Sequence, residues 1–408
     1  MKRVVITGMS VISSLGNTPY AAFERLHKFE NCVEYYRELD KYEQLTTRLA
    51  APIKDFIRPD YLTRKNTRSM GTVAIYAVTS AQEALKDANL LDDKIITSGR
   101  TGVAYGSSSG SLDAIIDFYS MSVENEVKSL NSGSYLKMMP QTTAVNISVY
   151  FKTTGRLIPS STACTSGSMS IGLAYEAIKN GLQTVMIAGG AEELHPTQIA
   201  VFDTLYATSQ KNNEPKLSPS PFDKDRDGLV IGEGAGTVIL EEYEHAKARG
   251  AKIYAEIIGF ATNTDGTHIT NPNAETMAQV MKQSLESANI SAEQVEYINA
   301  HATGTIQGDI AESQATYSVF NNTVPVSSIK CYTGHTLGAC GAIETVLTVE
   351  MMNNSWFCPN INLHNIDTNC AELDYITNNA RIFDIETAMT NNFAFGGINT
   401  SLILKKCL

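Results

Sequence analysis

The stretch Ser161-Thr-Ala-Cys-Thr-Ser-Gly-Ser-Met169 is the part of the sequence that says most about its architecture. An apolar, strand-like run at residues 158–163 leads into it, and a helical pattern at residues 169–180 follows. Cys164 therefore lies where a strand gives way to a helix. At a helix N-terminus the dipole favours a thiolate, and free backbone N–H groups can stabilise an oxyanion. The stretch suggests a nucleophile at Cys164, against the alternative of a small buried apolar side chain.

The same alternation of strand and helix extends in both directions from this stretch. Strands are expected at residues 2–8, 101–106, 184–190, 236–241, 252–260, 295–299, 324–329 and 400–404, and helices at 71–91, 169–180 and 274–288. Short apolar runs alternating with helical segments are typical of an α/β fold with buried, mostly parallel strands.

The order of elements repeats along the chain. Residues 158–163 run into the helix after Cys164, and residues 324–330 run into a small-residue helix after His335. We therefore expect two pseudo-equivalent halves, residues 1–250 and 251–408, whose paired helix N-termini face a shared site. A doubly wound nucleotide-binding fold is the alternative, but residues 8–16 lack its glycine-rich phosphate-loop spacing.

Composition narrows the class of protein. With 408 residues and 43% hydrophobic side chains, the chain can bury a large core. The net charge of −11 disfavours a nucleic-acid partner. Seven scattered cysteines without a CxxC pair argue against a disulfide framework and a zinc site. No apolar run is long enough for a membrane span and the N-terminus does not resemble a signal peptide, so a cytoplasmic protein is expected.

Five further segments were considered as candidate functional sites. His301 and His335 each follow a strand among glycines and threonines, where α/β proteins form ligand sites, although a single loop histidine is usually only a surface residue. Residues 391–399 hold a Gly-Gly pair that permits close backbone approach, or a plain tight turn. The basic stretch at 58–68 is either a solvated helix start or a docking patch for an acidic partner. Residues 221–236 begin like a calcium loop but lack its final glutamate, so no metal is expected.

Together these segments resemble the elongating β-ketoacyl-acyl-carrier-protein synthases of the type I/II class, which are thiolase-fold condensing enzymes. The resemblance covers the whole chain and places its motifs in family order. The matching positions are Thr162-Ala-Cys164; His301, Thr303, Thr305, Gly308 and Asp309; Lys330, Gly334, His335, Leu337, Ala339 and Glu344; Phe393, Phe395, Gly396, Gly397 and Asn399; and Asp225–Gly228.

The resemblance implies a five-layered αβαβα fold and a decarboxylative Claisen condensation in type II fatty-acid synthesis. By family analogy, Cys164 carries the acyl chain and the N–H groups of Cys164 and Phe395 form the oxyanion hole. The other implied roles are enolate stabilisation by His301 and His335, orientation of these histidines by Lys330 and Glu344, gating by Phe393 and Phe395, pantetheine binding by Thr270, Thr303 and Thr305, and carrier docking by Arg64, Lys65 and Arg68. The implied acyltransferase needs no cofactor or metal, since acyl carrier protein brings the phosphopantetheine. The resemblance also implies that the enzyme is a homodimer.

Some positions depart from the family pattern. Ala302, Gly304, Ala394 and Cys340 replace the residues usual in the family, which points to a different acyl substrate, and residues 107–110 are a candidate part of its pocket. The same chemistry in a specialised polyene or polyketide pathway is therefore an alternative. A non-catalytic chain-length partner would have lost Cys164, and a biosynthetic thiolase would carry a second cysteine where residues 393–399 stand.

Overall fold

A single mixed sheet of eleven strands organises the chain in the computed structural model, which describes every residue except 129 and 408. The first half of the chain supplies five neighbouring strands in the order β5 (Leu157–Ser160), β4 (Thr101–Gly106), β6 (Val185–Glu192), β7 (Gly234–Glu242) and β1 (Val4–Ser13). The ladders β5–β4 and β4–β6 are parallel, and β6–β7 and β7–β1 are antiparallel.

The second half of the chain repeats this topology. Its strands run in the order β10 (Pro325–Ser327), β9 (Tyr297–Asn299), β14 (Thr387–Ala394), β15 (Ile398–Lys405) and β8 (Ala255–Thr264), with β12 (Asp374–Tyr375) added at the edge. Again the first two ladders are parallel and the next two antiparallel. A short antiparallel pairing of β1 with β8 joins the halves into one sheet. The expected pseudo-equivalent halves are thus present, whereas the boundary at residue 250 stays a prediction.

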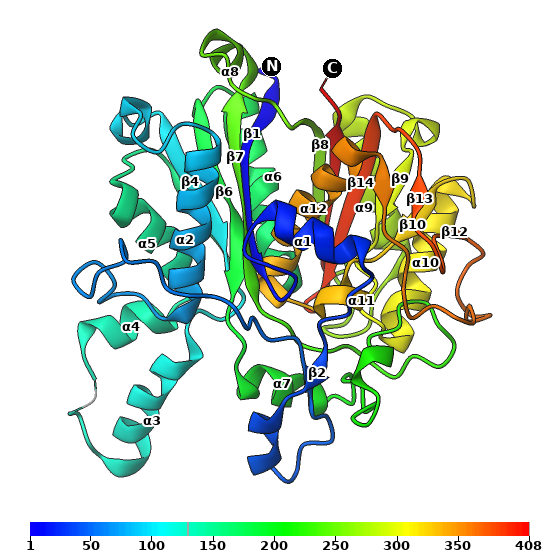
Figure 1. Ribbon diagram of the computed structural model, residues 1–408, viewed down its shortest axis with the longest axis horizontal. Coiled ribbons are helices and arrows are strands. Elements are labelled where there is room, and N and C mark those ends of the chain that lie inside the picture. Colours follow the sequence, from blue (N-terminus) through cyan, green and yellow to red (C-terminus); the bar gives the residue numbers. More distant parts are fainter. Residues whose placement is uncertain (129, 408) are drawn as a thin grey trace.

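Helices form three layers around the two halves of the sheet (Figure 1). The first outer layer is α2 (Thr72–Asp87) and α5 (Thr142–Phe151), and the opposite one is α9 (Ala274–Ala288) and α10 (Ile306–Phe320). Between the sheet halves lie α6 (Ser166–Lys179) and α12 (Cys340–Asn354), and each of them contacts strands of both halves. This is the five-layered αβαβα arrangement that was expected.

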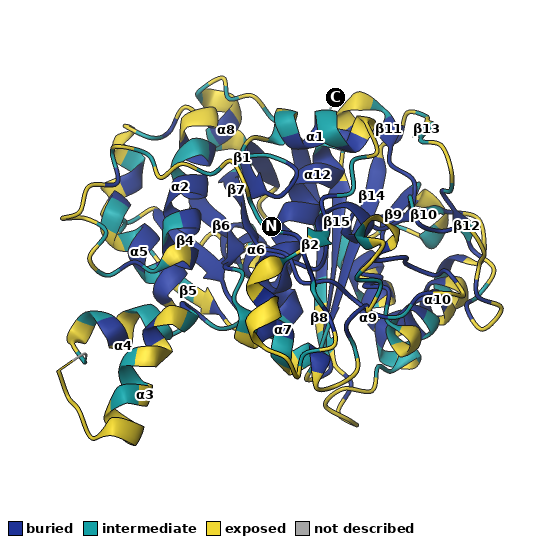
Figure 2. Ribbon diagram, turned by 60° about the horizontal axis from the view of Figure 1, so that its bottom comes forward, coloured by how far each residue is buried: buried dark blue, intermediate teal, exposed yellow. Residues whose placement is uncertain are grey.

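The remaining elements surround this core. They are α1 (Pro19–His27), α3 (Ile115–Glu124), α4 (Ser132–Met138), α7 (Pro196–Asp203), α8 (Tyr243–Ala248), α11 (Lys330–Thr333), β2 (Glu34–Tyr35), β3 (Leu49–Ala50), β11 (Trp356–Phe357) and β13 (Arg381–Ile382). Helix α3 has no buried residue, and α3 and α4 extend from the body of the molecule (Figure 2). Within the described part of the chain, no helix has the length and apolar character to cross a membrane.

Two expectations about the sheet were wrong. The strands are not mostly parallel, because the antiparallel ladders of β1, β7, β8 and β15 make up half of the main sheet. The first strand also does not end at Gly8. All ten residues of β1 are buried, and a Cβ on Gly8 would lie 2.3 Å from the carbonyl oxygen of Ala84 in α2. The glycine therefore marks a close helix–strand approach inside the strand.

Candidate active site

Cys164 lies at the junction expected from the sequence. Strand β5 leads into a short 3-10 turn, Ala163–Thr165, and α6 begins directly after it. A second 3-10 turn, Leu337–Ala339, precedes α12 in the other half of the chain. The start of α6 lies directly against the second turn, since a Cβ on Gly167 would lie 3.0 Å from the carbonyl oxygen of Gly338. The small residues after Cys164 are needed for this contact, which brings the two helix N-termini together.

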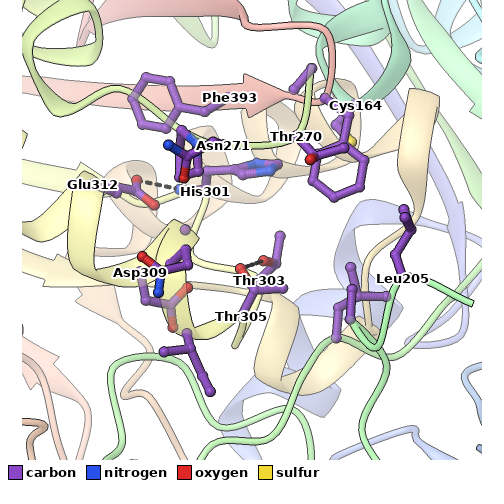
Figure 3. A pocket seen from close by; sticks show the side chains of 18 of the residues that line it. Cys164, Leu205, Thr270, Asn271, His301, Thr303, Thr305, Asp309, Glu312 and Phe393 are labelled. Carbon is purple, nitrogen blue, oxygen red and sulfur yellow. Dashed lines mark hydrogen bonds between the residues drawn. The ribbon is translucent and has the colours of Figure 1, made fainter. Parts of the chain in front are cut away.

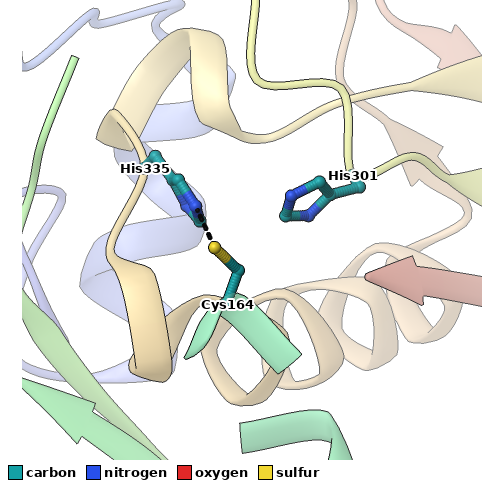
Figure 4. Close-up of side chains that lie close together, drawn as sticks. All are labelled: Cys164, His301 and His335. Atoms are coloured by element: carbon teal, nitrogen blue, oxygen red, sulfur yellow. Dashed lines mark hydrogen bonds between the residues drawn. The ribbon is translucent and has the colours of Figure 1, made fainter. Parts of the chain in front are cut away.

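Two histidines meet the thiol at this point (Figure 4). His335, just before the second turn, places Nε2 3.0 Å from Sγ of Cys164. His301 follows β9, and its ring is perpendicular to that of His335 with 5.2 Å between ring centroids. All three side chains are buried. The structure therefore brings together the three groups that the sequence singled out separately.

Burial controls the protonation of these groups. It raises the pKa of the Cys164 thiol to about 11, although the Lys330 charge and the backbone N–H groups of Phe395 and Cys164 act in the opposite direction. The backbone N–H groups at the helix terminus thus favour the thiolate as expected, and burial of the thiol opposes them and is the larger influence on its pKa. Burial also holds the pKa of His301 and of His335 well below the usual value, so both imidazoles are neutral.

A buried ion pair supports His301 through an asparagine. Lys330 and Glu344 form an ion pair with almost no solvent exposure. The amide Nδ2 of Asn392 donates to Glu344 at 2.8 Å and lies 3.4 Å from Nδ1 of His301. With an amide N–H directed at Nδ1, the proton of the neutral His301 belongs on Nε2. Sequence reasoning missed Asn392, although it stands one residue before Phe393 in the segment that was singled out.

Glu312 is a second residue that the sequence did not reveal. Its carboxylate oxygens accept the backbone N–H groups of His301 at 2.7 Å and Ala302 at 2.6 Å. Burial raises the pKa of Glu312 to about 8. The residue sits on α10 and fixes the backbone that carries His301. Hydrogen bonds to backbone amides leave no residue pattern from which Glu312 could have been recognised.

A cavity of about 390 Å³ connects this site to the surface (Figure 3). The predicted pantetheine residues Thr270, Thr303 and Thr305 line it, and the hydroxyls of Thr303 and Thr305 lie 3.1 Å apart. The predicted gate residues Phe393 and Phe395 line it as well, and the Phe395 ring packs on Phe202 with 5.4 Å between centroids.

The gate segment is the tip of a hairpin. Residues 391–394 belong to β14, and residues 395–397 make the turn into β15. Gly396 and Gly397 adopt φ values of 91° and 69°, which glycine tolerates without strain. The Gly-Gly pair is thus required by the turn itself.

The basic patch lies apart from the cavity lining. Arg64, Lys65 and Arg68 are exposed in turns before α2, and none of them forms an ion pair with another described residue. Their free charge is compatible with an acidic partner, and their role in docking stays a prediction.

The thiol and the two imidazoles also satisfy the distance requirement of a metal site. One ligand atom each from Cys164, His301 and His335 lies within 4.8 Å of the others. Such a donor set suits Zn²⁺. The expectation of a metal-free site therefore stays a prediction that needs its own experiment.

Comparison with known proteins gives this geometry a family. The model of the beta-ketoacyl synthase N-terminal domain matches residues 1–246, and that of the C-terminal domain matches residues 254–364. The chain belongs to the beta-ketoacyl synthase family. It is 38% identical to 3-oxoacyl-[acyl-carrier-protein] synthase 2 of Vibrio harveyi, over 99% of each chain.

Two solved structures of beta-ketoacyl synthase type extend the comparison. One from Burkholderia phymatum STM815 is 54% identical, covers all of both chains and superposes with a TM-score of 0.98. The other is a ketosynthase that carries a hexaketide, in complex with its type II PKS acyl-carrier protein. It is 29% identical, covers all of both chains and has a TM-score of 0.89. The chain thus has the thiolase-like ketosynthase fold.

Proposed function

We propose that this chain condenses a Cys164-bound acyl group with malonyl-acyl-carrier protein, in type II fatty-acid synthesis, to give 3-oxoacyl-acyl-carrier protein. The observation that carries the proposal is the convergence of Cys164, His301 and His335 at the inner end of one cavity. The relative from Vibrio harveyi is named for this product. Acyl transfer and enolate formation both place negative charge on a thioester oxygen, and hydrogen-bond donors at this site can stabilise that charge.

In the first half-reaction the acyl group moves from the carrier's thioester to Cys164. The neutral thiol hydrogen-bonds to Nε2 of His335, which can accept its proton as sulfur attacks the carbonyl carbon. The N–H groups of Cys164 and Phe395 face the sulfur and are placed to bind the developing oxyanion. The carbon–sulfur bond to the arm breaks, and the proton leaves with the carrier's thiol.

In the second half-reaction malonyl-acyl-carrier protein loses CO₂, and its thioester becomes an enolate. The Nε2–H of His301, directed by Asn392, donates to the enolate oxygen. No described residue bonds to Nδ1 of His335, so neither tautomer of that ring is fixed, and it can donate to the same oxygen once the thiol is acylated. The enolate carbon then attacks the acyl carbonyl, and the bond to the Cys164 sulfur breaks. The released thiolate takes up one proton from solvent, for which His335 is placed as the relay, and the neutral thiol is restored.

The partners and location form part of the proposal. Neutral imidazole donors suffice to hold the enolate, so no metal or bound cofactor is invoked. A homodimer is supported by the free edge of β5 and by exposed apolar side chains on α3, namely Ile115, Ile116, Tyr119, Met121 and Val123. A reducing compartment such as the cytoplasm is supported by the seven free cysteines.

A reconstituted assay tests the proposal. Purified protein is mixed with acyl- and malonyl-acyl-carrier protein, and the 3-oxoacyl product is measured by mass spectrometry. Cys164→Ala should abolish product, whereas Cys407→Ser, a change of a half-buried cysteine outside the site, should leave the rate unchanged. Undiminished condensation by Cys164→Ala would rule out the assigned nucleophile.

The same chemistry in a specialised polyene or polyketide pathway is the second candidate. The full-length likeness to a ketosynthase that carries a hexaketide favours it. The two candidates separate when Cys164 is loaded from saturated and from polyunsaturated or polyoxo acyl carriers of equal length. Loading of saturated chains supports fatty-acid synthesis, and loading of the other chains alone supports the specialised pathway. A non-catalytic partner subunit would show neither.

A further inference from the structure

The mouth of the active-site cavity is surrounded by exposed apolar side chains. Leu205, Tyr206, Ile269 and Ile306 line the same cavity as Cys164, and they are 48%, 84%, 75% and 53% exposed. We call these four residues the collar; Leu205 is seen beside the cavity in Figure 3. They come from three separate segments: the turn after α7, the loop at 265–272 and the first residue of α10. Exposed apolar residues that gather from distant segments around a cavity typically mark a binding surface.

Tyr206 stands out within the collar because its backbone is unfavourable for its side chain. Its φ is +54°, a left-handed value that bulky residues rarely adopt. The position ends α7, where the N–H groups of Tyr206 and Ala207 donate to the carbonyl oxygens of Asp203 and Phe202. Helices commonly place glycine or asparagine at such a position. An almost fully exposed ring contributes little to the core, so folding stability does not explain the tyrosine.

The cavity lining contains no basic side chain that could attract an acidic partner. Its acidic residues are Asp227, which is partly exposed, and Asp265, Asp309 and Glu312, which are buried, and no lining residue is lysine or arginine. An acidic partner would gain nothing from these charges. The basic residues Arg64, Lys65 and Arg68 lie outside the lining, where they can steer encounter without contacting the mouth.

We propose that the collar is the contact surface for an apolar face of the carrier-protein domain, with Tyr206 as its dominant residue. The inference rests on the proposed function, because an arm that reaches Cys164 through this cavity brings its protein against the mouth. A second copy of the chain is a poorer occupant, since it would close the path that the arm must take. Tyrosine is also among the residues that most often dominate interfaces.

The test compares substrates with and without the carrier. Tyr206→Asn removes the ring and places there a residue that tolerates the left-handed backbone. Tyr20→Ala, on α1 and 72% exposed but away from the cavity, is the matched control. Initial rates are measured with malonyl-acyl-carrier protein and with malonyl-pantetheine, both with preloaded Cys164.

We expect Tyr206→Asn to raise KM for the carrier-borne substrate by about fivefold or more, with a much smaller change for malonyl-pantetheine. Its melting temperature should not fall, and the KM difference should persist at high salt because apolar contacts are not screened. An equal change on both substrates, an unchanged KM for the carrier, or a shift in oligomeric state instead would overturn the proposal.

Failure of the proposed function is separable from failure of the collar. If wild-type protein condenses neither substrate, the proposed function fails. The collar is then decided by calorimetric binding of acyl carrier protein to the wild type and to Tyr206→Asn. Equal affinities overturn the proposal, and weaker binding by the variant supports it.

Discussion

The protonation of Cys164 can be tested directly by its alkylation at different pH values. For a thiol pKa of about 11, only about 3 in 10,000 molecules carry the thiolate at about pH 7.5. Because the thiolate is the reacting form, the rate of alkylation by iodoacetamide should rise about tenfold per pH unit from about pH 7 to about pH 10. The readout is the mass of the Cys164 peptide as a function of time.

Two variants extend this prediction. Lys330 lowers the pKa of Cys164 and Glu192 raises it. Lys330→Met should therefore slow alkylation at a given pH, and Glu192→Gln should accelerate it. Because Lys330→Met leaves Glu344 unpaired, Glu192→Gln is the variant that keeps the test informative if the first fails to fold. A rate that levels off below about pH 8 would refute the reasoning, because it would mean that the helix terminus overcomes burial.

Three other outcomes are expected. Lys330→Met should lower the free energy of unfolding, measured with urea, by about 3–5 kcal/mol, because it leaves the buried charge of Glu344 unpaired. The double variant Lys330→Met/Glu344→Leu removes both charges and should recover most of this loss. Equal losses in the two variants would contradict this reasoning. Folding raises the pKa of Glu312 from 4.5 to about 8, so the protein should lose stability as the pH rises from about 4.5 to about 8. A wild-type melting temperature that stays constant over this pH range would contradict the prediction. Treatment with EDTA should leave condensation unchanged, and a loss restored by Zn²⁺ would show that Cys164, His301 and His335 hold a metal.

The sequence was most informative where local signals and packing agree. Helix α9 was predicted to the residue, because Asn273 caps its start with a 2.9 Å bond to the N–H of Glu275 and Asn289 ends it in a left-handed conformation. Strand β4 was also correct, as a fully buried apolar run. Helix α3 was not predicted, and none of its side chains is buried against the core.

The site was predictable only as far as side-chain chemistry shows in the residue pattern. Cys164, His301 and His335 were found because each stands among small residues after an expected strand. Asn392 and Glu312 act through one amide and two backbone N–H groups, and such contacts depend on how distant segments pack. The opposing influence of burial on the pKa of Cys164 could not be predicted for a related reason, since the depth of burial is a property of the whole fold.

The interleaving of the two halves has a consequence for how the chain folds. Helix α6 of the first half rests on strands of the second, and α12 of the second half rests on strands of the first. Neither half alone can bury the central helix that follows its catalytic cysteine or histidine. Although the topology is a duplication, its copies are not interchangeable modules: they should melt in one cooperative transition, and a fragment that ends near residue 250 should not fold without its complement.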